Sequence, residues 1–377
     1  MPEISFAPGD IPFYLFILFI IAFFIQQIFY WVFFSRIAFY RRPAVKSVST
    51  GISVVICARN EYENLKKNLP LILGQDHPDF EVVVVNWSSD DDSSLLLEQL
   101  SRQYPQLKIV EIRENLNFFS GKKFPLSIGI KSAGKDIIVV TEAGCRPVSN
   151  QWLSFMGSRF TGSAEIVLSY GAFEKKKGFL NKLIRYDTFH TACRYLSASL
   201  AGIPFMGVGR NLAYLRSLFI NNKGFISHYR VHPGEDDLFI NKVARKNNTN
   251  VLLDPEGFTV SEQKLTLREW MIKKKNQALT SRLYRTGHRF LSAFYSLGIL
   301  LFYGLFMTLL IMKYNAILVL PVFLVKLITQ IFVFHRCMVK LNEKDLIWLV
   351  PFYELSMMVI DSFAAASSIL SRSNRWK

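Results

Sequence analysis

The sequence predicts an α/β domain with a doubly wound, mostly parallel sheet, placed between apolar segments long enough to lie in a membrane. Between Gly51 and about Val260, short Val- and Ile-rich runs alternate with helical patterns, and such alternation is typical of parallel sheets covered by helices. Outside that region the apolar residues gather in blocks, and hydrophobic residues make up 50% of the chain. This composition is typical of a membrane protein with a soluble insert.

The first apolar block, residues 11–34, has no charged side chain and is long enough to cross a hydrocarbon core of about 30 Å. Two acids precede the block and three arginines follow it, at Glu3, Asp10, Arg36, Arg41 and Arg42. A cleavable signal peptide would need a basic segment before the block. We therefore expect a retained helix, with the chain from residue 36 onward in the cytoplasm.

Five strands and three helices are expected in the soluble region. The strands are Val- and Ile-rich runs at residues 53–58, 81–85, 108–112, 137–140 and 165–170. The helices have apolar residues at helical spacing, over residues 61–73, 93–104 and 124–133. A region of about 200 residues can bury a full core by itself, so the membrane segments are expected to serve location or substrate access.

Two later apolar segments, residues 290–312 and 316–335, are separated by a short turn and are expected to form a helical hairpin that returns the chain to the cytoplasmic side. Lys326 within the second segment must face protein or water. The last block, residues 346–370, is followed by three cations. Because those cations would lie outside the cell if the block crossed the membrane, a re-entrant or interfacial segment is preferred to a fourth span.

Polar residues follow the first two strands, at the edge where α/β sheets bind ligands. The first strand leads into Ala58, Arg59, Asn60 and Glu61. Backbone N–H groups there can bind an anion or a uracil-like edge, and Glu61 can bind a ribose hydroxyl. An ordinary connection from strand to helix, with Asn60 as the helix N-cap, explains the segment equally well. Residues 86–92 follow the second strand and include Asp90, which can contact a nucleotide or stabilise the next helix N-terminus.

Two further segments supply cations and a carboxylate. Lys122 and Lys123 stand just before the third helix, so an ammonium group could reach a diphosphate, with a solvated lysine pair as the alternative. Glu142 follows the buried strand at residues 137–140, at the ligand-binding edge of the sheet. Gly144 stands where a second acid would complete an Asp-x-Asp type metal site for a sugar nucleotide diphosphate.

Three consecutive carboxylates, Glu235, Asp236 and Asp237, open an amphipathic helical pattern. A hydroxyl nucleophile that attacks an anomeric carbon needs a general base across from the leaving diphosphate, and an Asp at a loop–helix junction can be held there. An acidic helix N-terminus stabilised by the helix dipole is the structural alternative.

The chain resembles the family 2 glycosyltransferases of GT-A fold, in particular their membrane-anchored bacterial members. The resemblance rests on six segments in order and covers about residues 35–290: SVVICARNE, VVVVNWSSDD, SGKKFPLSIGI, IIVVTEAGCRP, GVGRNLAY and GEDDLFI. It implies a doubly wound mixed sheet and an inverting transfer from a nucleotide sugar.

The resemblance also implies roles for individual residues. The nucleotide would be bound by Ala58, Arg59, Asn60, Glu61, Asn86, Asp90 and Lys122. Asp236 would be the general base, flanked by Glu235 and Asp237. Arg210 and Asn211 would lie under the acceptor, and Lys273 and Lys274 would contact the diphosphate.

Three departures from the family pattern lie where metal, nucleotide and diphosphate meet. The DDxSxD-like loop lacks its leading acids, the TDADC-like motif keeps only Glu142, and the W-x-x-QKxRH-like motif reads Trp270 followed by residues 273–277. Glu142 alone would hold Mg²⁺ or Mn²⁺ weakly. Fixed lysines can stabilise a departing diphosphate instead. The other account is a homologue that has lost turnover and acts as a membrane scaffold or partner subunit.

These observations divide the chain into four expected parts. They are an N-terminal anchor over residues 1–35, a cytoplasmic glycosyltransferase domain over residues 36–262, a basic amphipathic interfacial segment over residues 263–289 and a C-terminal membrane region over residues 290–377. The net charge of +16 favours a nucleotide-sugar donor and anionic lipid over nucleic acid as partners. Four isolated cysteines fit a reduced cytosolic setting. We expect transfer at the cell membrane to a lipid or lipid-linked acceptor, as in cell-envelope polysaccharide or glycolipid synthesis.

Overall fold

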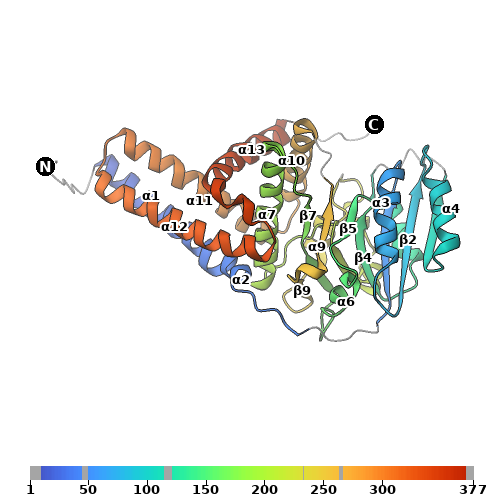
Figure 1. Ribbon diagram of the computed structural model, residues 1–377. Coiled ribbons are helices and arrows are strands. Elements are labelled where there is room, and N and C mark those ends of the chain that lie inside the picture. Colours follow the sequence, from blue (N-terminus) through green and yellow to red (C-terminus); the bar gives the residue numbers. More distant parts are fainter. Residues whose placement is uncertain (1–9, 45–49, 114–120, 232, 263–265, 371–377) are drawn as a thin grey trace. The chain divides into compact units, whose positions relative to one another are not determined.

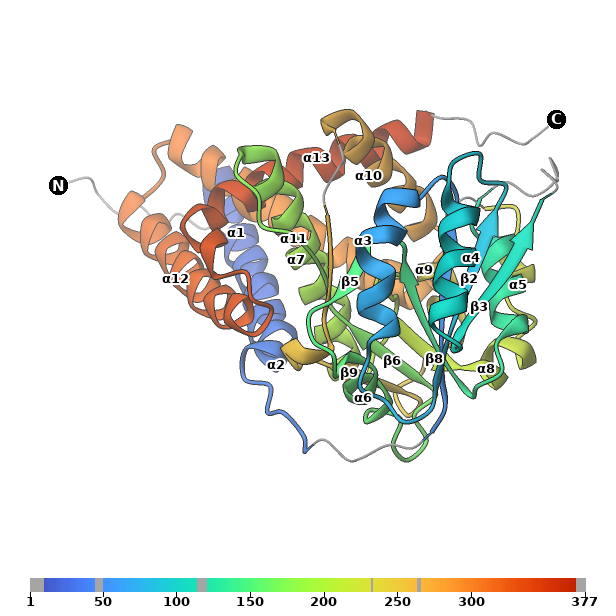
Figure 2. The ribbon, with the colours of Figure 1, turned by 45° about the vertical axis from the view of Figure 1, so that its right-hand side comes forward.

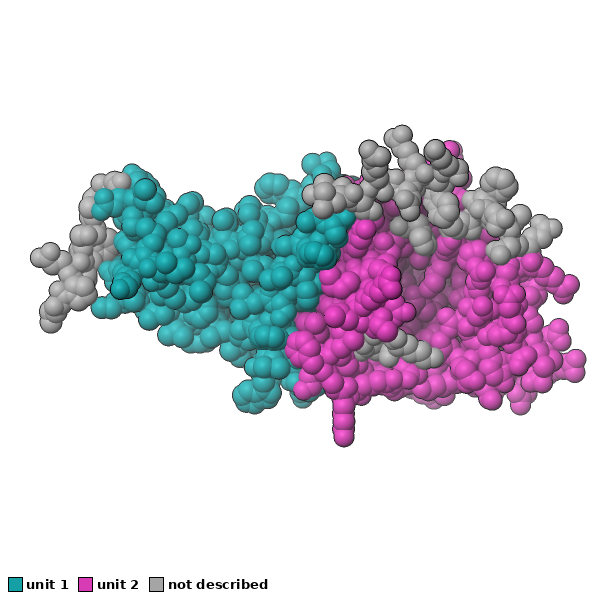
Figure 3. All heavy atoms as spheres, turned by 90° about the horizontal axis from the view of Figure 1, so that it is seen from above, with its two compact units in different colours: residues 1–40, 285–377 teal, residues 41–284 magenta. Residues whose placement is uncertain are grey.

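The computed structural model describes residues 10–44, 50–113, 121–231, 233–262 and 266–370 (Figure 1). The chain divides into two compact units, which Figure 3 shows in different colours. The helical unit comprises Met1–Tyr40 and Arg285–Lys377, and the α/β unit comprises Arg41–Tyr284.

A seven-stranded mixed sheet forms the centre of the α/β unit (Figure 2). In spatial order its strands are β3 (Leu107–Ile112), β2 (Phe80–Trp87), β1 (Ile52–Ala58), β4 (Ile137–Glu142), β8 (Leu212–Leu215), β6 (Ile166–Ser169) and β9 (Thr249–Leu252). Strand β8 runs antiparallel to both of its neighbours, and the other pairs are parallel. The expected doubly wound mixed sheet is confirmed, and all five expected strands are present.

The strand order reverses beside β1. The chain continues from β1 to β2 and β3 on one side, whereas β4 pairs with β1 on the other side. In open α/β sheets, ligands bind outside the carboxyl ends of the strands at such a reversal. The fold therefore places the candidate site beyond the C-terminal ends of β1 and β4.

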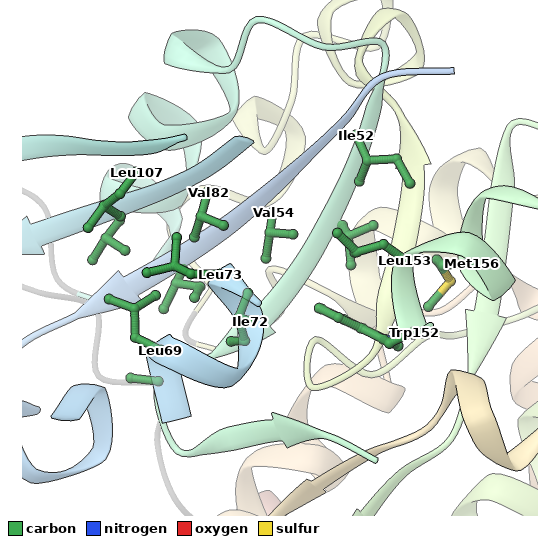
Figure 4. Close-up of a cluster of buried hydrophobic side chains, with 14 of the residues drawn as sticks. Ile52, Val54, Leu69, Ile72, Leu73, Val82, Leu107, Trp152, Leu153 and Met156 are labelled. Atoms are coloured by element: carbon green, nitrogen blue, oxygen red, sulfur yellow. The ribbon is translucent and has the colours of Figure 1, made fainter. Parts of the chain in front are cut away.

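Helices cover both faces of the sheet, which explains why β1, β2 and β4 are continuous apolar runs. On one face, α3 (Tyr62–Leu73), α4 (Ser93–Gln103) and α6 (Trp152–Gly157) bury a cluster that includes Val54, Leu69 and Trp152 (Figure 4). On the other face lies α5 (Lys123–Ser132). A Cβ atom at Gly129 would lie 2.7 Å from side-chain atoms of Val55 and Val85, so the absence of a side chain there permits close helix–sheet packing.

A smaller sheet and four more helices complete the α/β unit. The sheet has the order β5 (Cys145–Pro147), β10 (Thr259–Ser261), β7 (Gly171–Phe173). The helices are α7 (Phe179–Leu200), α8 (Arg216–Asn221), α9 (Asp237–Val243) and α10 (Leu267–Ser281). The long helix α7 is not among the helices expected above, because its buried side chains include polar residues such as Arg185 and Asp187 and so obscure the apolar periodicity.

The helical unit contains four helical segments long and apolar enough to cross a membrane. They are Ile11–Ala38, α11 (Thr286–Ile311), α12 (Ala316–Lys340) and Lys344–Ser368. The first segment contains α1 (Ile11–Ile28), a π-helical stretch (Phe29–Phe34) and α2 (Ser35–Ala38). The last contains a 3₁₀ segment (Lys344–Leu349) and most of α13 (Val350–Leu370). Helices α1, α11 and α12 pack side by side, whereas α13 runs obliquely to them in both views (Figures 1 and 2).

A buried polar cluster joins α13 to the other three helices. Lys326 on α12 forms an ion pair with Glu354 on α13, and both side chains are nearly inaccessible to solvent. Tyr30 and Tyr303 donate hydrogen bonds to the two oxygens of Glu354, at 3.2 and 2.6 Å. Lys326 therefore faces protein, which is one of the two environments that the sequence required.

The segment expected to lie at the membrane interface contributes a helix to the α/β unit. Trp270 on α10 is buried, and its Nε1 donates a hydrogen bond of 3.0 Å to Asp187 on α7. The Trp270 ring therefore packs within the protein and anchors α10 to α7. Leu267, Ile272 and Lys273 on the same helix have exposed side chains.

Candidate active site

The candidate site begins at the shared C-terminal edge of three parallel strands. Cys57 on β1 pairs in register with Glu142 on β4, and Ala58 on β1 pairs with Asn86 on β2. The sheet thus brings together the strand ends from which the sequence predicts a nucleotide site and a carboxylate.

A short hydrogen-bonded path joins the strand that bears Glu142 to the carboxylate of Asp236. The Thr141 hydroxyl donates a hydrogen bond of 2.9 Å to the carbonyl oxygen of Arg210. The N–H of the preceding residue, Gly209, donates a hydrogen bond of 2.8 Å to Asp236 Oδ2. A Cβ atom at Gly209 would lie 3.4 Å from that same oxygen. The glycine-rich loop therefore holds Asp236 at a defined position relative to the end of β4.

The Glu142 carboxylate is surrounded by cations. Lys122 Nζ lies 3.1 Å from Glu142 Oε1, and both side chains are about half exposed. The charge of Lys122, followed by those of Lys273 and Arg210, lowers the pKa of Glu142 to about 2. In turn, the Glu142 carboxylate raises the pKa of Lys122. Glu142 is therefore ionised at neutral pH, and its charge is balanced by side chains of the protein.

Arg210 and Lys273 both contact the aromatic ring of Phe173. The guanidinium carbon of Arg210 lies 4.2 Å from the centroid of the Phe173 ring, and Lys273 Nζ lies 5.7 Å from the same centroid. Both geometries are cation–π contacts. Phe173 belongs to the three-residue strand β7, which is too short to give a sequence pattern, so only the structure identifies it.

The three consecutive acids at residues 235–237 have different surroundings. Asp236 is the N-cap of α9 and accepts the N–H of Asp237 at 2.8 Å through Oδ1. Asp237 is buried and accepts hydrogen bonds from the hydroxyls of Thr280 and Tyr284, at 2.6 and 2.8 Å. Burial, followed by repulsion from Asp236, raises the pKa of Glu235 to about 7. Of the three carboxylates, that of Asp237 is occupied by hydrogen bonds that link α9 to α10 and to Tyr284 after it.

Lys123 supports the loop that leads into these acids. Its Nζ donates hydrogen bonds to the carbonyl oxygens of His228, Val231 and Pro233. Burial lowers the pKa of Lys123 to about 8. The two adjacent lysines thus have separate tasks, because Lys122 contacts Glu142 while Lys123 binds the carbonyl oxygens of His228, Val231 and Pro233.

The loops after β1 and β2 are joined by side-chain hydrogen bonds. Asn60, at φ 55°, accepts the N–H of Asp90 at 2.8 Å through its side chain, and its own N–H donates to the Ser89 hydroxyl at 3.0 Å. The guanidinium carbon of Arg59 lies 5.0 Å from the centroid of the Trp87 ring. Helix α3 begins at Tyr62, and its N-cap is Glu61 rather than Asn60. Asn60 therefore stabilises the paired loops, and Asp90 keeps an exposed carboxylate.

Three of the predicted contact residues have their polar groups occupied inside the protein. Asn86 bonds to Ser94, Glu111 and Ser89, and Asn211 bonds to Trp152, Tyr170 and Gly257. Lys274 forms a buried ion pair with Asp187 at 2.8 Å. Because these hydrogen-bonding groups are already satisfied, the predicted contacts of Asn86 with nucleotide, Asn211 with acceptor and Lys274 with diphosphate would require an internal hydrogen bond or ion pair to be exchanged for one with the ligand.

The described side chains around Glu142 offer a divalent cation one carboxylate that is already surrounded by cations. Among the described residues no group of three or more His, Cys, Asp or Glu side chains is arranged to hold a metal ion. Glu142 is ion-paired with Lys122, and Lys273 and Arg210 add positive charge at that carboxylate. Mg²⁺ and Mn²⁺ favour several oxygen ligands, and a cluster of fixed cations opposes the approach of another.

Comparison with known proteins supports the fold. The structure matches a mannosyltransferase of Pyrobaculum calidifontis, solved with GDP-Man and Mn²⁺, with a TM-score of 0.56 and 17% sequence identity, covering 87% of this chain and 97% of that one. At this identity the likeness establishes the fold alone, which is GT-A.

Sequence comparison gives short matches to named glycosyltransferases. Glycosyltransferase AglE of Haloferax volcanii is 29% identical over 114 residues, which are 30% of this chain and 36% of that protein. Poly-beta-1,6-N-acetyl-D-glucosamine synthase of Staphylococcus epidermidis is 27% identical over 117 residues, which are 30% of this chain and 27% of that protein. The matches thus cover about a third of the length of these relatives.

The family model described as glycosyl transferase family 2 matches residues 53–220. The matched region starts in β1 and ends in α8, and it contains the C-terminal strand edge, Glu142 and the glycine-rich loop with Arg210. Residues 53–220, somewhat less than half of the chain, therefore match glycosyl transferase family 2, and the structure has a GT-A fold.

Proposed function

We propose that the protein is an inverting glycosyltransferase that moves a sugar from a nucleotide sugar to a hydroxyl group of a membrane-associated acceptor. The observation that carries the proposal is the hydrogen-bonded path from Thr141 through Gly209–Arg210 to Asp236. It holds a carboxylate in fixed relation to the cations around Glu142. A base on one side and cations on the other are what direct displacement of a diphosphate requires.

In the proposed reaction Asp236 acts as the general base. It accepts the proton of the acceptor hydroxyl as that oxygen forms a bond to the anomeric carbon. The bond between the anomeric carbon and the diphosphate oxygen breaks, and the electron pair stays with the diphosphate. Both oxygens of Asp236 accept backbone N–H bonds at 2.8 Å, which fix the carboxylate orientation for proton transfer.

The acceptor is proposed to be a membrane lipid or a lipid-linked glycan presented at the cytoplasmic face. Support comes from the chain order, since α10 ends at Ser281 and the membrane-length helix α11 begins at Thr286. Arg36 lies at the end of the first membrane-length segment, and Arg41 and Arg42 follow it. Such cations favour a cytoplasmic location. The partial match to a polysaccharide synthase fits a cell-envelope glycan.

The test is donor turnover and binding by Asp236→Asn. Turnover is expected to fall by at least about 100-fold, while affinity for UDP or GDP stays within about threefold of wild type. Asn keeps one acceptor oxygen for two N–H donors, so a loss of about 1–3 kcal/mol in the free energy of unfolding is also expected. Glu98→Gln, an exposed acid on α4, is the matched control. An active Asp236→Asn enzyme would remove Asp236 from the mechanism.

A second candidate is a homologue that no longer turns over donor and acts as a scaffold or partner subunit. Two observations favour it, namely that Gly144 provides no carboxylate beside Glu142 and that Asn86 is committed to a buried network. A screen of UDP-, GDP- and CDP-sugars with and without Mn²⁺ separates the two candidates. Hydrolysis or transfer of any donor supports the enzyme, and complete inactivity with retained folding supports the scaffold.

A further inference from the structure

The side chains around Glu142 form an excess of positive charge. Lys122, Lys273 and Arg210 all act on the single carboxylate of Glu142. Asp187 and Asp236 also act on Lys273, but Asp187 forms an ion pair with Lys274 and Asp236 is the proposed base. Glu235 acts on Lys122, but burial and the charge of Asp236 raise its pKa to about 7. Three cations against one carboxylate leave two positive charges to be balanced, and a diphosphate group carries negative charge of that order at neutral pH.

Arg210 is the buried member of this group, and most of its hydrogen-bonding capacity is unused. Its side chain is buried, with 7% of its surface exposed, and its Nε has no hydrogen-bond partner among the described residues. One hydrogen bond, from Nη1 to the carbonyl oxygen of Ala172, is long at 3.5 Å. A buried guanidinium without an ion-pair partner is costly. The cost is offset if an anion binds to it, because planar guanidinium groups pair well with phosphate oxygens.

The position of Arg210 is determined by its backbone and by the ring beneath it. Its carbonyl oxygen accepts hydrogen bonds from Thr141 and Thr259, each at 2.9 Å. The guanidinium carbon lies 4.2 Å from the centroid of the Phe173 ring, which also contacts Lys273. A Cβ atom at Gly171 would lie 2.8 Å from Arg210 Cβ, so a larger residue there would displace the arginine.

We propose that Arg210, Lys273 and Lys122 together form a metal-independent binding site for the diphosphate of the donor, in place of a divalent cation. The inference rests on the proposed function only in taking a nucleotide sugar as the natural ligand. It assigns Arg210 to the leaving group rather than to the acceptor. When the anomeric C–O bond breaks, the electron pair passes to the diphosphate, and the added negative charge is stabilised by these three fixed cations.

The experiment measures binding of UDP and GDP to the purified full-length protein by calorimetry, in EDTA and in millimolar Mn²⁺. The wild type is expected to bind at least one diphosphate in EDTA, with a dissociation constant within about threefold of that in Mn²⁺. Arg210→Met and Lys273→Gln are each expected to weaken diphosphate binding at least about tenfold, and UMP or GMP binding by less. Arg210→Lys should restore part of the loss. Lys275→Gln, on the same helix as Lys273, is the matched control and should bind as wild type.

Thermal unfolding distinguishes a ligand-binding arginine from a structural one. Because its charge has no ion-pair partner among the described residues, Arg210→Met without ligand should unfold at the same temperature as wild type or higher. The upward shift that diphosphate causes in the wild type should be lost. A lower unfolding temperature for ligand-free Arg210→Met, with unchanged diphosphate affinity, would overturn the proposal.

The remaining outcomes separate this proposal from the proposed function. Wild-type binding that appears only with Mn²⁺ overturns the metal-independent site and leaves the glycosyltransferase proposal intact. Equal loss of monophosphate and diphosphate binding in Arg210→Met overturns the assignment to the diphosphate. An absence of UDP and GDP binding in both EDTA and Mn²⁺ overturns both proposals.

Discussion

The ion pair between Lys326 and Glu354 gives a quantitative test of the helical unit. Lys326 Nζ also donates hydrogen bonds of 2.9 Å to Tyr303 and to Gln330. The side chains of the pair have relative exposures of 1% and 2%. Removing one partner of such a pair leaves an uncompensated charge, which typically costs about 3–5 kcal/mol.

We therefore expect Glu354→Gln to lower the free energy of unfolding by about 3–5 kcal/mol, because the ammonium of Lys326 then lacks a counter-ion. The amide oxygen introduced by this substitution can still accept a hydrogen bond from a neighbouring tyrosine, so most of the loss reports the charge. Adding Lys326→Met removes the isolated cation and is expected to restore about 2 kcal/mol or more. The two substitutions should thus be strongly non-additive.

Unfolding in mixed micelles with increasing SDS is the assay, applied to wild type, both single variants and the double variant. Arg336→Met, an exposed cation on the same helix, is the control and should change stability by less than about 1 kcal/mol. If the double variant is less stable than Glu354→Gln by the full cost of Lys326→Met, the two side chains do not interact energetically and the reasoning is wrong.

Three further outcomes are expected. Burial and the charge of Asp236 raise the pKa of Glu235 from 4.5 to about 7. Between these pH values the folded state binds more protons than the unfolded state, so the free energy of unfolding should fall as the pH rises. In urea titrations, Glu235→Gln should make this decline smaller. Gly144→Asp should strengthen Mn²⁺-dependent binding of UDP or GDP, since a Cβ there fits at 3.6 Å from Ser261; unchanged metal dependence would show that one acid does not rebuild the site. In intact cells an impermeant maleimide should label Ser5→Cys but not Lys246→Cys, and the reverse pattern would place the α/β unit outside.

The sequence alone was sufficient to identify the sheet and the edge that carries chemistry. The four consecutive apolar residues at 137–140 are typical of a strand covered on both faces, and Glu142, two residues beyond that run, must lie near the strand end. The apolar blocks likewise predicted membrane-length helices, since an uncharged run of such length has few other locations. The acids at residues 235–237 marked a helix start, and the structure begins α9 at Asp237.

Only the tertiary structure decided which side chains are available for chemistry. Adjacent residues on a helix point about 100° apart, so Lys273 faces outward beside Phe173 whereas Lys274 is buried against Asp187. The same holds for Asn211, whose side-chain NH₂ group donates hydrogen bonds to the carbonyl oxygens of Tyr170 and Gly257, both distant in sequence. Such partners are brought together by long-range folding and leave no local pattern, and for this reason the role of the buried Arg210 guanidinium emerged only from its surroundings.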